Sequence, residues 1–158
     1  MIRQPALAVI GAGDASAALR DLAFAVGRET ASRGATLVCG RRGGVMESAA
    51  AGARSLGGHT IGILPGYEHA GANEHIEFVI ATGMGEARNV IVVASADAAV
   101  AIAGEAGTLS EIALAIKLGR PVVALDSWHE TAGIRHADSP AAAVALALEL
   151  AGCADSRS

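Results

Sequence analysis

Ala103-Gly104-Glu105-Ala106-Gly107-Thr108-Leu109-Ser110-Glu111 joins an apolar run, Ala98–Ile102, to a helical pattern that continues through Ile116. A strand, a turn of small residues and a helix start, in this order, are typical of an anion-binding site. The first N–H groups of a helix have no partner within it, and the helix dipole places partial positive charge there. Glycine allows a phosphate to approach these amides closely. The stretch therefore predicts a site for a phosphorylated small molecule.

Apolar segments of strand length recur along the chain and alternate with helical patterns. Most are continuous apolar runs, as expected for parallel strands buried on both faces. The alternation predicts an α/β fold, a single-domain Rossmann-like open parallel sheet with helices on both faces. The expected strands are Leu7–Ile10, Ala35–Cys39, His59–Leu64, Ile76–Ala81, Ala98–Ala103 and Pro121–Leu125, and the expected helices are one around Leu19–Val26, Gly44–Leu56, 86–95, 109–118 and 140–150.

Length and composition indicate one globular domain. The 158 residues are 52% hydrophobic and 18% charged, which excludes a disordered chain. We expect the domain to cover residues 1–151 and a flexible C-terminal tail to cover 152–158. The net charge of −4 and the absence of a basic stripe disfavour nucleic-acid binding.

The cysteines and histidines indicate the redox compartment and whether a metal site is expected. Cys39 and Cys153 are far apart in sequence and are interpreted as reduced thiols of a cytoplasmic protein. The five histidines have no recognised ligand spacing, so no metal site is expected. No apolar stretch reaches the length of a membrane span, and the N-terminus has no signal-peptide pattern.

Five glycine-bearing turns follow the expected strands. Ligands of open parallel sheets bind beyond the carboxyl ends of the strands, so we expect these turns to converge. Gly11-Ala12-Gly13 begins like a dinucleotide fingerprint but lacks its third glycine, which disfavours an NAD site, and Asp14 or Ser16 is available to cap the following helix. The turns are Gly11–Asp14, Gly40–Gly44, Pro65–Gly71, Gly83–Gly85 and Gly104–Thr108.

Charged residues beside these turns each have two interpretations. Arg41 and Arg42 are either phosphate ligands or solvated loop charges. Arg88, at a helix start, opposes the helix dipole and is expected to face a negative group of a ligand or of an ion pair. Thr108 and Glu111 have the spacing of a capping box with Thr108 at the N-cap, and Glu111 is alternatively a catalytic acid or base.

Four motifs in order carry a family resemblance over roughly residues 6–126. They resemble the lonely-guy/DNA-processing-A (SLOG) Rossmann superfamily, in the branch of the molybdenum-cofactor carrier proteins. The motifs are Gly40-Arg41-Arg42-Gly43-Gly44-Val45-Met46-Glu47, Gly62-Ile63-Leu64-Pro65-Gly66, Thr82-Gly83-Met84-Gly85-Glu86-Ala87-Arg88-Asn89 and Gly107-Thr108-Leu109-Ser110-Glu111-Ile112-Ala113.

The resemblance implies a cytoplasmic carrier for a phosphorylated heterocycle, most specifically molybdenum cofactor (molybdopterin), whose metal arrives bound to the pterin. It also implies a homo-oligomer, a dimer or a tetramer. With the glycine turns, it predicts that the ligand contacts Gly11, Gly13, Gly40, Arg41, Gly43, Gly44, Arg88, Gly104, Gly107 and Thr108.

Two further functions stay open at this point. A lonely-guy enzyme cleaves the N-glycosidic bond of nucleoside 5′-monophosphates, and Glu111 and Arg88 would then be catalytic. The chain departs from that enzyme's pattern, with Ala103 for proline, Asn89 for lysine and Glu105 for glycine. Single-stranded DNA handling is the third function, which the acidic charge and the scarcity of aromatic residues and lysines disfavour.

Overall fold

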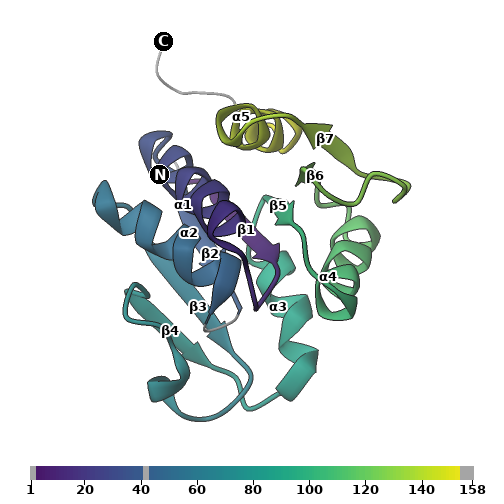
Figure 1. Cartoon of the computed structure of the whole chain (residues 1–158). Helices are drawn as coiled ribbons and strands as arrows, with labels where there is room; N and C mark the ends of the chain where they lie inside the picture. The colour runs from purple at the N-terminus through teal and green to yellow at the C-terminus, as the bar shows by residue number, and fades with distance from the viewer. Residues whose placement is uncertain (1–2, 41–42, 154–158) are drawn as a thin grey trace.

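The computed structural model describes residues 3–40 and 43–153 and has one seven-stranded sheet in which every neighbouring pair of strands is parallel (Figure 1). The strand order is β4-β3-β2-β1-β5-β6-β7, so the winding of the chain reverses between the adjacent strands β1 and β5. The strands are β1 (Ala6–Gly11), β2 (Thr36–Cys39), β3 (Thr60–Leu64), β4 (Phe78–Ala81), β5 (Ala98–Ile102), β6 (Val122–Leu125) and β7 (Arg135–Ala137).

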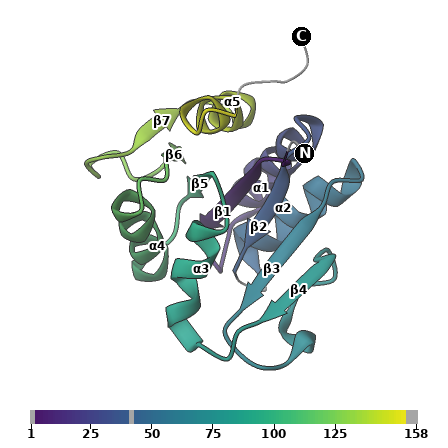
Figure 2. The ribbon, with the colours of Figure 1, turned by 180° about the vertical axis from the view of Figure 1, so that it is seen from behind.

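Helices cover both faces of the sheet (Figures 1 and 2). On one face α1 (Ala17–Ser32), α2 (Gly44–Ser55) and α5 (Pro140–Leu150) pack on one core cluster. On the other face α3 (Asn89–Ala94) and α4 (Ala106–Lys117) pack on a second cluster. The prediction of a single α/β domain with a Rossmann-like parallel sheet is confirmed.

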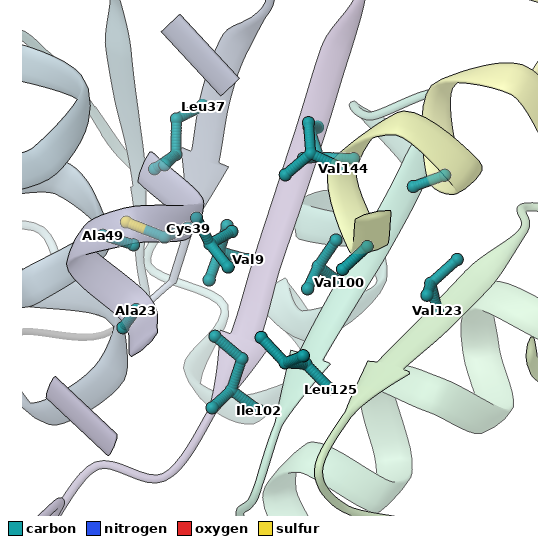
Figure 3. Close-up of a cluster of buried hydrophobic side chains, with 14 of the residues drawn as sticks. Val9, Ala23, Leu37, Cys39, Ala49, Val100, Ile102, Val123, Leu125 and Val144 are labelled. Atoms are coloured by element: carbon teal, nitrogen blue, oxygen red, sulfur yellow. The ribbon is translucent and has the colours of Figure 1, made fainter. Parts of the chain in front are cut away.

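Small side chains allow the layers to approach closely. Figure 3 shows the first core, in which Val9, Val100 and the small Ala23 lie between the sheet and its helices. Where α1 crosses α2, a Cβ built on Gly27 would lie 1.9 Å from the carbonyl oxygen of Ala49, and only glycine fits that contact. The alanine-rich composition therefore reflects close packing of helix on sheet.

Several predicted boundaries are wrong, for local reasons. Residues 86–95 form a 3₁₀ turn, η2 (Gly85–Arg88), followed by the short α3, and a second 3₁₀ turn, η1 (His69–Gly71), precedes β4. Helix α4 begins at Ala106, three residues before the predicted 109. Strand β7 was not predicted, because Arg-His-Ala has no apolar run and lies at the edge of the sheet.

Among the described residues, no helix or strand precedes β1 and none follows α5. Of the predicted tail 152–158, residues 154–158 lie outside the described part, while the N–H groups of Gly152 and Cys153 donate to the carbonyls of Glu149 and Leu148. Among the helices of residues 3–40 and 43–153, none has the length and apolar character needed to cross a bilayer.

Candidate functional site

A pocket of about 820 Å³ lies beyond the carboxyl ends of β1, β2 and β3 and against the start of α4. The winding of the chain reverses between β1 and β5, and open α/β sheets bind ligands beyond the carboxyl ends of the strands at such a point. Its lining includes eight of the predicted site residues: Gly11, Gly13, Gly40, Gly43, Arg88, Gly107, Thr108 and Glu111. Gly44 and Gly104 are not part of the lining, and Arg41, like Arg42, lies outside the described residues.

The first turn of α4 forms one wall of the pocket. Its residues Ala106, Gly107 and Thr108 all line the cavity. Their N–H groups belong to the first turn, which has no acceptor within the helix, and they carry the positive end of the helix dipole. An anion at this wall would receive backbone hydrogen bonds without help from a basic side chain.

The predicted capping box in α4 is wrong. The N-cap is Glu105, whose side chain makes no capping hydrogen bond, and Thr108 is the third helical residue. The preceding turn explains the shift, because Ala103 and Gly104 have φ of 51° and 107° and start the helix early. A Cβ built on Gly104 would lie 2.1 Å from Thr108 Oγ1, so Gly104 is needed behind the wall although it does not line the pocket.

The loop after β6 binds the turn at Ala103, on the side away from the pocket lining. Ser127 Oγ accepts a hydrogen bond of 3.0 Å from the N–H of Ala103, and Trp128 Nε1 donates one of 2.8 Å to the carbonyl oxygen of Ala103. Trp128 also packs against the core cluster under α3 and α4. Both polar groups of the Ala103 backbone are therefore bound by one loop.

Gly44 packs against the turn after β1, across the pocket from α4. Its φ is +63°, and a Cβ there would lie 2.3 Å from the carbonyl oxygen of Ala12. The N–H of Val45 donates to that same carbonyl at 2.9 Å, which ties the start of α2 to the turn after β1. Ser16, one of the two predicted caps of α1, accepts from the N–H of Leu19.

Arg88 is buried at the floor of the pocket, with 2% of its surface exposed. Its Nη1 donates a hydrogen bond of 2.9 Å to the carbonyl oxygen of Ile63. A Cβ on Gly40 would lie 2.2 Å from that nitrogen, so the guanidinium crosses directly over the glycine. That Arg88 also faces a negative group of a ligand or of an ion pair stays a prediction.

Glu111 and Arg88 both line the pocket. Burial raises the pKa of the Cys39 thiol, at the end of β2, to about 12, while the Arg88 charge lowers it and the Glu111 charge raises it. Glu111 is 8% exposed and lines the cavity. A ligand in the pocket can therefore contact this largely buried side chain.

Two features of the lining were predicted only in part from the sequence. Exposed carboxyl side chains line the cavity, from Asp14, Glu68, Glu86 and Glu105, and of these the sequence singles out only Asp14, as a possible cap of α1, and Glu105, as a departure from the family pattern at the phosphate turn. The side chain of Asn89 donates from Nδ2 to Ser110 Oγ at 3.1 Å, and that hydroxyl donates to the carbonyl of Gly107 at 2.8 Å. This chain of bonds joins the start of α3 to the first turn of α4.

Metal binding has no support in the described side chains. Among residues 3–40 and 43–153, no group of three or more His, Cys, Asp or Glu side chains is arranged to hold a metal ion.

Relatives of known sequence share most of this chain. The model of the SLOG cluster4 family matches residues 4–151. An uncharacterised protein of Archaeoglobus fulgidus is 42% identical over 138 residues, which are 87% of this chain and 91% of that protein. A cytokinin riboside 5′-monophosphate phosphoribohydrolase of Mycobacterium tuberculosis is 34% identical over 131 residues, 75% of this chain and 68% of the enzyme.

Two solved structures resemble the whole fold. The molybdenum cofactor binding protein of Rippkaea orientalis superposes with a TM-score of 0.88 at 35% identity, covering 95% of this chain and 99% of the other. The molybdenum cofactor carrier protein of Chlamydomonas reinhardtii superposes with a TM-score of 0.87 at 34% identity and the same coverage.

Proposed function

The chain belongs to the SLOG cluster4 family, and from this premise we propose that it is a carrier that binds a phosphorylated heterocycle, most specifically molybdenum cofactor. The observation that carries the proposal is the first turn of α4, whose residues line a pocket of about 820 Å³ beyond the carboxyl ends of the strands, where the winding reverses. That volume lies within the range of pockets that enclose a small organic ligand. The resemblance to two molybdenum cofactor proteins supports molybdenum cofactor as the heterocycle.

The phosphate is assigned to the wall made by α4. Gly107 and Thr108 supply backbone N–H groups, Thr108 adds its hydroxyl, and Gly104 permits the turn that aims them. Arg88 contributes positive charge from the floor. The pterin is assigned to the side lined by Gly11, Gly13, Gly40 and Gly43, which Gly44 braces and to whose loop Arg41 belongs.

The proposal includes assembly into a homo-oligomer. Large apolar side chains are exposed on β4, from Phe78 and Ile80, and on α4, from Leu109 and Ile116. Exposed apolar side chains of this size are typical of a subunit contact. Light scattering during size-exclusion chromatography would give a dimer or tetramer mass if this is right, and a monomer mass would contradict it. We also place the protein in the cytoplasm, in keeping with its two free cysteines.

A nucleoside 5′-monophosphate phosphoribohydrolase is the second candidate, favoured by the buried side chains of Glu111 and Arg88, which line the same pocket. In that reaction water attacks the anomeric carbon, the N-glycosidic bond breaks, and the free base and ribose 5-phosphate leave. The Glu111 carboxylate would stabilise positive charge on the sugar and accept a proton of the attacking water, a proton that ends on the leaving nitrogen of the base, and Arg88 would orient the ribose phosphate.

One preparation separates the two candidates. Mass spectrometry of ligand released from the natively purified protein, combined with an AMP hydrolysis assay on the same sample, reads out both. A bound pterin phosphate without release of ribose 5-phosphate is expected for the carrier. Steady release of adenine that disappears in Glu111→Gln would overturn the carrier in favour of the hydrolase.

A bulky substitution locates the phosphate. Gly107→Trp fills the wall of α4 and is expected to abolish ligand binding while the circular dichroism spectrum is preserved. Leu118→Trp adds the same bulk to an exposed position at the other end of the helix and is expected to bind normally. Unchanged affinity in Gly107→Trp would place the phosphate elsewhere.

A further inference from the structure

Tyr67, the only tyrosine of the chain, stands at the rim of the pocket. It lies just past the end of β3, and 82% of its surface is exposed, more than any other large hydrophobic side chain of the described residues. Solvent exposure of an aromatic ring forgoes the stabilisation that burial would give. A ring held in this position beside a cavity is therefore available to a ligand.

The backbone around Tyr67 is fixed by a neighbouring loop. The N–H of Gly83 donates to the carbonyl of Gly66 at 2.9 Å, and the N–H of Gly85 donates to the carbonyl of Pro65 at 2.9 Å. These bonds attach the turn after β3 to the turn after β4. The position of Tyr67 is thus set by the sheet rather than by a free loop.

The ring itself rests on Gly83. A Cβ built on Gly83 would lie 2.3 Å from Tyr67 Cε1 and 2.6 Å from Cζ, so any side chain there would displace the ring. Gly83 also has φ of +63°, a conformation that favours glycine. One edge of the phenol is therefore supported by backbone, while most of the side chain stays exposed.

The distance across the sheet matches an elongated ligand. The anion-binding wall of α4 follows β5, and Tyr67 follows β3, with β1 and β2 between them. Three strand spacings amount to about 14 Å. A ligand with its phosphate at α4 and an extended body across the strand ends would bring its far end toward Tyr67.

We propose that the Tyr67 ring is the surface on which the planar heterocycle of the ligand stacks, an inference that rests on the proposed binding of a phosphorylated heterocycle. Offset stacking between an aromatic side chain and a heterocyclic base contributes binding energy without reading individual hydrogen-bonding groups. Tyr67 then separates ligands that carry an aromatic heterocycle from bare sugar phosphates, which have no ring to stack.

Tyrosine-labelled protein tests the contact directly by NMR. Because the chain has one tyrosine, ¹³C-labelled tyrosine gives a single set of ring signals. AMP and 6-hydroxymethylpterin phosphate are expected to shift these signals through their ring currents, while ribose 5-phosphate binds with little shift. Binding of AMP and the pterin without a shift of the Tyr67 signals would overturn the inference and leave the proposed function intact.

Variants give the energetic test by isothermal titration calorimetry. Tyr67→Leu is expected to weaken binding of AMP by about tenfold and to leave ribose 5-phosphate unchanged, and Tyr67→Phe is expected to retain wild-type affinity for both. Phe24→Leu, an aromatic change on α1 outside the pocket lining, is the control and is expected to change neither.

Equal affinity of Tyr67→Leu and wild type for AMP would contradict the stacking. Equal weakening of AMP and ribose 5-phosphate would also contradict it, because the residue would then act on the phosphate end. If the wild-type protein binds none of the three probes, the proposed function itself fails, and the stacking fails with it.

Discussion

The indole Nε1 of Trp128 donates a hydrogen bond of 2.8 Å to the carbonyl oxygen of Ala103, and both residues have positive φ, 59° for Trp128 and 51° for Ala103. Non-glycine residues in this region each cost about 1–2 kcal/mol, so the two conformations persist only because the surroundings hold them. These two residues hold the turn that leads into α4, whose first residues line the pocket. The loop after β6 thus positions the wall without lining it.

Trp128→Phe is expected to weaken phosphate-ligand binding. The change retains an aromatic ring in the core gap but removes the bond to Ala103, so the turn is held less firmly. We expect the Kd for AMP, measured by calorimetry, to rise by about three- to tenfold, with a loss of about 1 kcal/mol in the free energy of unfolding.

The control for Trp128 is Ala103→Gly, which keeps the carbonyl acceptor and relieves the cost of the positive φ. It is expected to bind AMP within about twofold of wild type. If Trp128→Phe binds as tightly as wild type, the indole bond has no part in positioning the wall.

The fold was predictable because its signal is local. Continuous apolar runs such as Ala98–Ile102 mark strands buried on both faces, and the glycine turns after them mark the binding edge of the sheet. The prediction that Gly11, Gly40 and Gly107 lie together is correct, because the carboxyl ends of parallel strands meet on the same side of the sheet.

The remaining features depend on contacts distant in sequence. The start of α4 is set by Ser127 and Trp128, which bind Ala103 from the next strand's loop, so the capping-box spacing of Thr108 and Glu111 was misleading. The place of Tyr67 depends on bonds between two turns that no periodicity encodes. One hydrogen-bond acceptor for Arg88 is the backbone carbonyl of Ile63, which side-chain identity does not specify.

The two cysteines are expected to differ in reactivity. Burial raises the pKa of Cys39 to about 12, so at pH 8 its thiol stays protonated and has no access to solvent. Burial also raises the pKa of Cys153, but that side chain is only partly buried. Iodoacetamide at pH 8 should alkylate Cys153 in the native protein and both thiols in denaturant, as mass spectrometry of the peptides would record.

Equal native labelling rates at Cys39 and Cys153 would contradict this expectation, because a thiol inside the core beneath the pocket would then have to open to solvent. A ligand in the pocket should leave the Cys153 rate unchanged, which makes that thiol the internal reference.

Asp97 is expected to make stability depend on acid pH. Burial alone would raise its pKa, but hydrogen bonds from Arg3 and from the N–H of Ala6, with the positive charges of Arg3 and Arg120, lower it below the usual value. A carboxyl with a lowered folded-state pKa stabilises the fold fully above its unfolded pKa, about 3.9, and loses that contribution as the pH falls through the folded-state pKa.

Asp97→Asn should therefore be less stable than wild type by about 1 kcal/mol at pH 7, and the difference should disappear near pH 2. Urea unfolding at a series of pH values measures it, with Asp138→Asn in the loop after β7 as the control. A difference in stability that stays constant from pH 7 to pH 2 would mean that the ionised carboxylate of Asp97 is not what stabilises the start of β1 at Ala6.

Glu105 sets the charge balance at the anion-binding wall. Its exposed carboxylate is the N-cap of α4, where negative charge interacts favourably with the helix dipole and repels a ligand phosphate bound to the same turn. Two unit charges about 5 Å apart in water repel by roughly 1 kcal/mol. Glu105→Gln is therefore expected to tighten AMP binding by about three- to fivefold at low salt, at a cost of about 0.5 kcal/mol in the free energy of unfolding.

The salt dependence of AMP binding shows whether Glu105→Gln acts by removing a charge or by changing a direct contact. The gain in affinity should shrink toward zero in about 1 M NaCl, where the screening length is about 3 Å. Glu149→Gln removes a carboxylate of the same kind from the far end of α5 and should leave the Kd for AMP unchanged at either salt. Weaker binding of AMP by Glu105→Gln would reverse the assignment, because the carboxylate would then be accepting hydrogen bonds from the ligand rather than repelling its phosphate.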